Sequence, residues 1–147
     1  IKGLGGALLR EKMVAAQSRD LVIIADAGKR VARLGTKAPL PVEVVSFAWQ
    51  VHVPVFESLG ARPVLRTHAD GSAFLTDNGN YLMDCHFPDG ISDPLGLESR
   101  LRREVGVVET GLFLGMATAA IIASESGVET LSAPTGRGIG LRGMERT

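Results

Sequence analysis

The sequence has almost no cysteine, no excess charge of either sign and no long apolar run, and each absence excludes a class of protein. Cys85 is the only cysteine among 147 residues, so an intrachain disulfide is impossible and a reducing compartment is expected. Lys and Arg number 16, Asp and Glu also number 16, and the formal net charge is zero. Nucleic-acid-binding proteins usually carry a basic excess or a basic stripe. We therefore expect no nucleic-acid partner.

The longest uncharged stretch, residues 110–124, argues against a membrane protein. It is shorter than the ~20 apolar residues that a spanning helix needs, and Gly115 and Thr118 interrupt it. Hydrophobic residues make up 45% of the chain and charged residues 22%, which is the ordinary composition of a globular protein. We therefore expect a folded cytoplasmic protein with no membrane partner.

The beginning of the chain has the pattern of an α/β protein. Residues 3–20 have the pattern of a glycine turn that enters a helix, and the run LVIIA at 21–25 follows them. Such an unbroken apolar run is typical of a strand buried on both faces of a parallel sheet. A helix followed by this strand predicts a doubly wound α/β architecture, which binds ligands at the carboxyl ends of its strands.

Residues 41–113 have a different pattern. The expected elements are strands over 42–45, 62–66 and 107–113, helices over 47–59 and 94–104, and a hairpin within 74–87. Asn78-Gly79 predicts a type I′ turn for that hairpin. Gly60 is expected to end the first helix, and Asp93-Pro94 to open the second. The resulting order, β-α-β-β-α-β, is the ferredoxin-like arrangement.

These patterns together predict an α/β fold with a Rossmann-like parallel sheet and an inserted small domain. The ferredoxin-like α+β unit is expected over residues 41–113. The Rossmann-like domain is expected to comprise 1–40 and 114–132, with two short strands at 119–123 and 128–131 rejoining the first sheet. The remaining residues, 133–147, are expected to form a loose tail.

The opening segment, IKGLGGALLREK, carries most of the functional information. Glycines before a helix let backbone N–H groups approach an anionic or oxygen-rich ligand. The segment is not a dinucleotide fingerprint, because Leu8 stands at the third glycine position, and no Gly-Lys-Ser/Thr follows to make a P-loop. The glycines therefore either line a ligand site or only form a turn.

Three charged side chains are candidate site residues. Glu11 lies more than one turn into the expected helix beside apolar residues, where partial shielding from water would suit it to proton transfer; Lys2 is its candidate partner. The alternative is that Arg10-Glu11-Lys12 is a solvated, charged helix face. Lys29 follows the LVIIA strand, where an α/β sheet binds ligands. A lysine there suits a phosphate, although an exposed loop lysine is the alternative.

The three histidines and the cysteine give no sign of a metal site. His52, His68 and His86 lack the spacing of metal ligands, and Cys85 alternates with Met83 as a core residue would. We expect no metal.

Several motifs, taken together, resemble the type A ribose-5-phosphate isomerase family. IKGLGGALLREKMV resembles that family's KGGGGALLREK-type segment, and LVIIADAGKRV, KAPLPVEVV, FLTDNGNYLMD and GVVETGLF follow in the family's order and at similar spacing. The resemblance extends from Ile1 to about Leu131. It implies interconversion of D-ribose 5-phosphate and D-ribulose 5-phosphate through an enediolate, without metal or organic cofactor, in the non-oxidative pentose phosphate pathway.

The resemblance also assigns roles to residues. It implies that Glu11 is the base, that Lys2 binds the sugar and stabilises the developing oxyanion, and that Lys29 helps to hold substrate. Gly3, Leu4 and Gly5 would form the backbone part of the sugar site, although Leu4 stands where many members have glycine. The inserted domain is associated in this family with subunit contacts, so a homodimer or homotetramer is expected.

Two motifs of the family, a GTGST-type phosphate loop and a DGADE acidic motif, do not occur in this sequence. We therefore expect the chain to be the carboxy-terminal part of the enzyme, with the amino-terminal segment missing, and to be a poor catalyst alone. The alternatives are a related sugar-phosphate isomerase or deaminase, a regulatory ligand-binding module, and a noncatalytic subunit that keeps only the oligomer interface.

Overall fold

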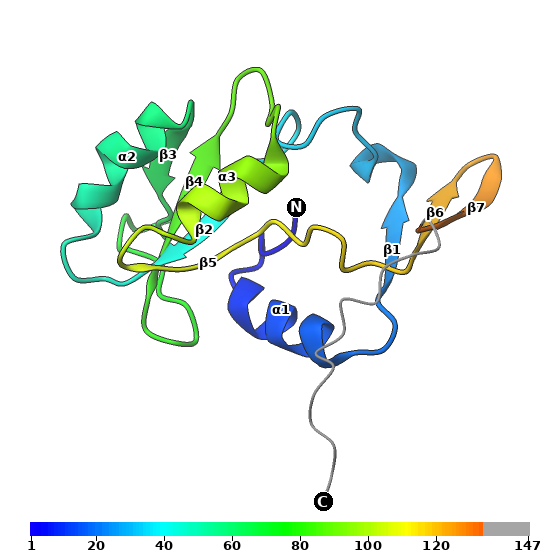
Figure 1. Cartoon of the computed structure of the whole chain (residues 1–147), viewed down its shortest axis with the longest axis horizontal. Coiled ribbons are helices and arrows are strands. Elements are labelled where there is room, and N and C mark those ends of the chain that lie inside the picture. Colours follow the sequence, from blue (N-terminus) through cyan, green and yellow to red (C-terminus); the bar gives the residue numbers. More distant parts are fainter. Residues whose placement is uncertain (134–147) are drawn as a thin grey trace, which may run out of the picture.

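The computed structural model describes residues 1–133, whose strands form two separate sheets (Figure 1). In chain order the elements are α1 (Leu8–Gln17), β1 (Val22–Asp26), the 3-10 turn η1 (Ala27–Lys29), β2 (Leu40–Val44), the 3-10 turn η2 (Trp49–Val51), α2 (His52–Ser58), β3 (Arg62–Leu65), β4 (Tyr81–His86), α3 (Pro94–Leu101), β5 (Val107–Thr110), β6 (Ala119–Ser124) and β7 (Gly127–Ser132). Apart from Ala133, the predicted loose tail lies outside the described residues. None of the helices formed by residues 1–133 has the length and apolar character that crossing a bilayer requires.

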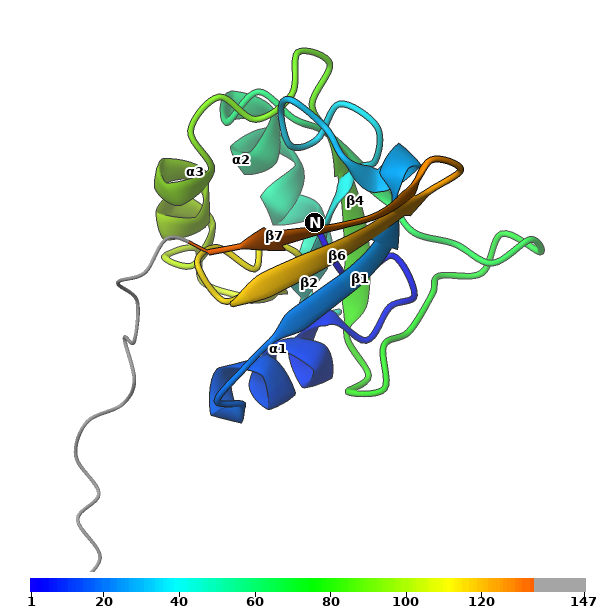
Figure 2. The ribbon, with the colours of Figure 1, turned by 90° about the vertical axis from the view of Figure 1, so that its right-hand side faces the viewer.

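The first sheet has the strand order β1-β6-β7. β1 and β6 run parallel, with Val22 opposite Ala119 and Asp26 opposite Ala123. β6 and β7 are the two short strands expected to rejoin this sheet. They pair antiparallel as a hairpin that projects beside β1 (Figure 2). The parallel pair, made of strands far apart in sequence, confirms the predicted Rossmann-like component.

The expectation that β1 is buried on both faces is wrong for the described residues. Val22 is 48% exposed and Ile24 is 77% exposed. Side chains alternate between the two faces of a strand, so these two residues share one face, which residues 1–133 leave open. An unbroken apolar run specifies a strand whose faces can both be covered, but other elements decide whether they are.

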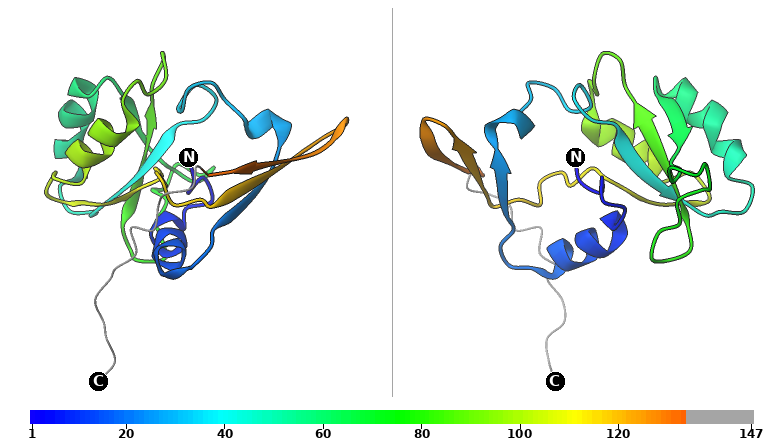
Figure 3. Two further views of the ribbon diagram at one scale, coloured as in Figure 1. Left: turned by 45° about the vertical axis from the view of Figure 1, so that its right-hand side comes forward. Right: turned by 180° about the vertical axis from the view of Figure 1, so that it is seen from behind.

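The second sheet is antiparallel with the order β3-β4-β2-β5, which confirms the ferredoxin-like arrangement. Helices α2 and α3 lie together on one side of it (Figure 3). β2 is central and buried along its whole length. Its core cluster includes Leu40, Val42, Val44, Phe56 of α2, and Leu97 and Leu101 of α3. Helix α1 also packs on this unit, against β5 and β2.

Both predicted helix boundaries in this unit are confirmed. Gly60 has φ 87°, and its N–H donates to the Glu57 carbonyl at 2.9 Å while Ala61 N–H donates to the Phe56 carbonyl at 3.1 Å. This is the Schellman pattern that ends α2. At α3, the Asp93 carboxylate accepts from Gly96 N–H at 3.0 Å, and the adjoining proline fixes the backbone of the first turn.

The predicted type I′ turn at Asn78-Gly79 is wrong. That turn needs positive φ at both central residues, whereas among the described non-glycine residues only Ala48 has positive φ. The turn instead spans residues 76–79 and closes with Gly79 N–H donating to the Thr76 carbonyl at 2.9 Å. Tertiary contact explains the difference, because the Asn78 side chain donates to the Glu43 carboxylate at 3.0 Å.

Three element lengths also differ from expectation. The predicted hairpin over 74–87 is reduced to an isolated bridge between Leu75 and Tyr81, the first residue of β4. The predicted helix over 47–59 becomes η2 followed by α2, because Ala48 adopts a left-handed conformation with φ 53°. β5 ends at Thr110, where the chain turns away from the sheet.

Candidate active site

The glycine segment makes a tight turn that delivers the chain into α1. Gly3 and Gly6 have φ of 88° and 92°, which side chains rarely allow. Gly6 N–H donates to the Gly3 carbonyl at 2.9 Å. A Cβ added at Gly3 would lie 2.5 Å from Leu8 Cβ, so α1 begins in direct contact with the turn. Glycine is therefore required here by conformation and by space.

Contacts from the ferredoxin-like unit hold this turn. Arg66, just beyond β3, donates to the Leu4 carbonyl at 2.9 Å. The Arg66 guanidinium is itself fixed by Asp84, with Nε donating to Oδ2 at 2.8 Å. Lys2 N–H donates to the Gly111 carbonyl at 2.9 Å. The backbone that carries the candidate residues is therefore anchored from two sides.

Lys2 and Glu11 meet directly. Lys2 Nζ lies 3.2 Å from Glu11 Oε1, with side-chain exposures of 34% and 39%. The ammonium also lies 5.6 Å from the centroid of the Phe113 ring, which favours a cation over its face. The carboxylate is less shielded than the sequence led us to expect, but it is paired with the one residue that the sequence singled out as its partner.

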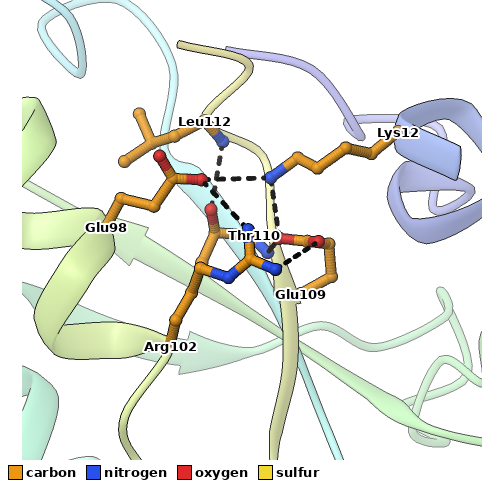
Figure 4. Close-up of polar contacts among 6 residues, drawn as sticks. All are labelled: Lys12, Glu98, Arg102, Glu109, Thr110 and Leu112. Carbon is orange, nitrogen blue, oxygen red and sulfur yellow. Dashed lines mark hydrogen bonds and ion pairs between the residues drawn. The ribbon is translucent and has the colours of Figure 1, made fainter. Parts of the chain in front are cut away.

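The solvated-face alternative for the triplet is correct for Arg10 and wrong for Lys12. Arg10 is 57% exposed and pairs with Asp77 at 2.9 Å. Lys12 is only 7% exposed, and its ammonium donates to the Glu109 carboxylate at 2.7 Å (Figure 4). Three consecutive charged residues thus point in different directions, and only Glu11 faces the candidate site.

A pocket of about 970 Å³ connects the candidate residues. Its lining includes Lys2, Gly3, Leu4, Gly5 and Glu11 from the opening segment, Asp26 and Lys29 at the end of β1, and Leu112, Phe113 and Leu114 after β5. All six sequence-predicted site residues line this single pocket. The pocket lies at the carboxyl end of β1, as expected for an α/β sheet.

The turn that carries Lys29 is held by charged groups on both sides. The Asp26 carboxylate accepts from Gly28 N–H at 2.9 Å, and Lys37 Nζ donates to the Gly28 carbonyl at 2.9 Å. Lys29 itself is exposed and also lines the pocket. Its charge is therefore available to a ligand.

Cations outnumber carboxylates in the pocket wall. Lys2, Lys29, Arg30 and Lys37 line it, against Glu11 and Asp26. Arg30 is partly neutralised by Glu129 at 3.0 Å, but the excess remains positive. Such a wall suits an anionic ligand. Within residues 1–133 no group of three or more His, Cys, Asp or Glu side chains is placed to hold a metal ion.

Sequence reasoning missed Lys37, Arg66 and Phe113. Lys37 lies between the expected elements, and Arg66 and Phe113 are only the ends of expected strands. Each reaches the site through a tertiary contact, so no local spacing marks it. Sequence reasoning also missed that Lys12 is buried, because a helix face can be assigned only when the packed neighbours are known.

Most of this chain is similar in sequence to proteins of one known family. The family model described as Ribose 5-phosphate isomerase A (phosphoriboisomerase A) matches residues 1–127. Ribose-5-phosphate isomerase A of Synechococcus sp. (strain JA-3-3Ab) is 55% identical over 131 residues, covering 89% of this chain and 56% of the relative. The corresponding protein of Gloeobacter violaceus is also 55% identical, over 90% of this chain and 56% of the relative.

Solved structures match as well. Ribose 5-phosphate isomerase from Plasmodium falciparum has a TM-score of 0.85 at 36% identity, covering 90% of this chain and 59% of that one. A D-ribose-5-phosphate isomerase in complex with phospho-erythronic acid has a TM-score of 0.86 at 34% identity, covering 90% and 58%. The chain thus spans somewhat more than half the length of the relatives it matches. Taken with the matched residues, these likenesses show that the chain belongs to the ribose 5-phosphate isomerase A family.

Proposed function

We propose that this chain contributes the proton-transferring part of an isomerase that interconverts D-ribose 5-phosphate and D-ribulose 5-phosphate. The observation that carries the proposal is the 3.2 Å contact between Lys2 and Glu11 in a cation-rich pocket that Lys29 also lines. One carboxylate and one ammonium side by side are what an enediolate reaction needs. A module that only binds a ligand would leave this pairing without a role.

Glu11 is the proposed base. It removes the proton from C2 of the open-chain aldose and returns it to C1, so that one C–H bond breaks and another forms. The proton of the C2 hydroxyl moves to the C1 oxygen, which completes the ketose. A single carboxylate can make both transfers because C1 and C2 are adjacent.

Lys2 is the proposed electrophile. When the C2 proton leaves, negative charge develops on the C1 oxygen, and an ammonium beside that oxygen lowers the energy of the enediolate. The same ammonium lies 3.2 Å from the Glu11 carboxylate. The backbone of Gly3, Leu4 and Gly5 lines the pocket next to this pair, where it can position the sugar hydroxyls.

Lys29 is proposed to bind the negatively charged groups of the substrate. Binding energy from a phosphate remote from the reacting carbons can be used to position them. The similar structure that contains phospho-erythronic acid, a phosphorylated sugar acid, supports a ligand of this class. The proposed reaction belongs to the non-oxidative pentose phosphate pathway and involves no cofactor, and we place it in the cytoplasm.

We also propose that the protein is a homodimer or homotetramer. Large apolar side chains stand exposed on the ferredoxin-like unit, notably Phe47 at 87%, Val51 at 60% and Val105 at 93%. Exposed apolar side chains of this size suit an interface where they lie together, and they stand on the unit that the resemblance associates with subunit contacts. Sedimentation equilibrium of the parent and of Phe47→Ser would test the assembly, since weaker association in the variant is expected.

The experiment that tests the reaction is proton exchange at C2 of ribose 5-phosphate in D₂O, followed by NMR. It compares the complete gene product with its Glu11→Gln variant, because the amide keeps the shape of the side chain but cannot accept the proton. Exchange and ribulose 5-phosphate formation should fall at least a hundredfold, a loss in the range attributed to positioned acid–base groups.

The matched control is Glu125→Gln, the same substitution on an exposed turn between β6 and β7. It should exchange at the parent rate. Equal exchange in Glu11→Gln and parent would remove Glu11 from the mechanism, and no exchange in the folded parent would reject the proposed reaction.

A further inference from the structure

Lys12, the neighbour of the proposed base, has its charged end inside the protein. Its side chain is 9% exposed, and its ammonium lies 2.7 Å from Glu109 Oε1 and 3.3 Å from Glu98 Oε1. The two carboxylates are 7% and 18% exposed. Figure 4 shows the Lys12 ammonium, on α1, between the carboxylates of Glu109 on β5 and Glu98 on α3. A lysine so completely enclosed is rare in proteins unless it is paired, and this one has two partners.

The carboxylates are in turn fixed by other groups. Glu109 Oε1 also accepts the N–H of Thr110 at 2.8 Å. Arg102 lies 3.9 Å from Glu109 and 4.0 Å from Glu98, which adds a second positive charge at the rim of the cluster (Figure 4). Lys12 therefore adds a buried ionic attachment between α1 and the ferredoxin-like unit, beside the exposed pair of Arg10 and Asp77.

The segment that carries Glu109 also contacts the proposed catalytic pair. Two residues of segment 109–113 make these contacts. The Glu109 carboxylate accepts from the Lys12 ammonium, and the Gly111 carbonyl accepts from the backbone N–H of Lys2 at 2.9 Å. The Phe113 ring lies beneath both ammonium groups, 5.6 Å from Lys2 Nζ and 5.1 Å from Lys12 Nζ. A single short segment thus contacts both Lys2 and the buried residue of α1, and it helps to place each of them.

Rotation of α1 decides where Glu11 points. Adjacent helical residues are about 100° apart around the axis, because a turn contains 3.6 residues. With Lys12 fixed on the side of β5, Glu11 must face the pocket and Lys2. A small rotation of α1 would move the Glu11 carboxylate by more than the tolerance of a proton transfer.

We propose that Lys12 is a positioning residue for Glu11, acting through its buried ion pair with Glu109. This inference rests on the proposed isomerase function. It gives the ferredoxin-like unit a part in the chemistry, since Glu109 on β5 holds the helix on which the base is carried.

The test uses the complete gene product and the double variant Lys12→Met/Glu109→Gln. The double variant removes both charges of the closer pair, while Glu98 keeps Arg102 as a partner. Two quantities are measured for every variant: the stoichiometry and affinity of phospho-erythronic acid binding by calorimetry, and the rate of C2 proton exchange per binding site. Rates per site are insensitive to misfolded protein, so a merely structural role would not change them.

We expect full stoichiometry, affinity within threefold of the parent, and exchange per site reduced ten- to hundredfold, the range that a displacement of about 1 Å can produce. If the double variant does not bind phospho-erythronic acid, the isosteric Glu109→Gln variant tests the proposal instead. Its exchange rate per site should fall three- to tenfold. Exchange per site within twofold of the parent in either binding-competent variant would overturn the proposal.

Two controls separate this inference from the function on which it rests. Arg19→Met removes a cation that is 95% exposed just beyond α1 and should leave exchange unchanged. Glu11→Gln should abolish exchange. No exchange in the folded parent rejects the proposed function, and normal exchange in Glu11→Gln rejects Glu11 as the base. A loss of exchange in Glu11→Gln beside full activity of the Lys12 variant rejects only the positioning role.

Discussion

Lys2 donates its backbone N–H to the carbonyl of Gly111 at 2.9 Å, so the opening segment of the chain lies along the continuation of β5. Gly111 N–H in turn donates to the Pro41 carbonyl at 2.8 Å. A Cβ at position 111 would collide with the Lys2 carbonyl oxygen and would lie 3.0 Å from Pro41 Cδ. The position of one proposed site residue therefore depends on the absence of a side chain at a distant one.

The first prediction concerns that glycine. Gly111→Ala should force Lys2 away from the sheet extension and destabilise the fold on the order of 1–3 kcal/mol, the usual cost of overpacking. Urea unfolding followed by circular dichroism would measure it. Gly5→Ala is the stability control, because an added Cβ there meets nothing within 4 Å. Equal stability of the two variants would show that residues 1–3 can move without cost.

The second prediction concerns Glu43, which is fully buried. One of its oxygens accepts from Thr76 at 2.9 Å, Asn78 at 3.0 Å and Asn80 at 2.8 Å. Glu43→Leu would leave three donors without this acceptor and should cost roughly 3 kcal/mol or more of unfolding free energy. Glu43→Gln keeps an acceptor oxygen and should cost clearly less. Urea unfolding of both variants is the measurement, and equal losses would contradict the role of the acceptor.

The third prediction concerns the pH dependence of stability. Burial lowers the pKa of His52, and nearby Glu104 raises it by a smaller amount; the side chain is 3% exposed and stacks on Phe56. The unfolded imidazole titrates near about 6.5, so below that pH the unfolded chain binds more protons than the folded one. Stability from this residue is therefore present above about pH 6.5 and is lost as the pH falls.

His52→Gln should accordingly flatten the decline in stability between pH 7 and pH 5, as chemical unfolding at several pH values would show. The comparison at pH 8, where the imidazole is neutral in both states, corrects for any packing lost in the variant. A decline of the same slope in variant and parent would assign it to other groups.

The fourth prediction concerns the single thiol. Cys85 lies in the core of β4 with 1% exposure, and burial, followed by the charge of Asp84, raises its pKa far above the usual range. Thiolate is the reactive form. Iodoacetamide should therefore leave the folded protein unmodified at pH 8 and alkylate it fully in urea, as mass spectrometry would detect. Rapid alkylation under native conditions would show that β4 opens locally.

Local signals predicted most of the elements. Gly60 and Asp93-Pro94 marked helix ends because a capping pattern depends on a few adjacent residues, and the strand order of the ferredoxin-like unit followed from the order of its elements. The turn at Asn78-Gly79 was predicted wrongly because its conformation does not depend on adjacent residues alone. Its conformation is set by Glu43, a residue far away in the sequence, whose carboxylate binds the asparagine side chain.

The sequence by itself determined the family, the sheet topologies and the candidates Lys2, Glu11 and Lys29, because periodicity, caps and ordered motifs are properties of the chain. Only the tertiary structure decided that Lys2 touches Glu11, that Lys29 lines the same pocket, and that Lys12 is buried against Glu109. Those facts depend on which faces meet when distant segments pack. A charged triplet looks the same in a sequence whether it is solvated or divided between a pocket and a core.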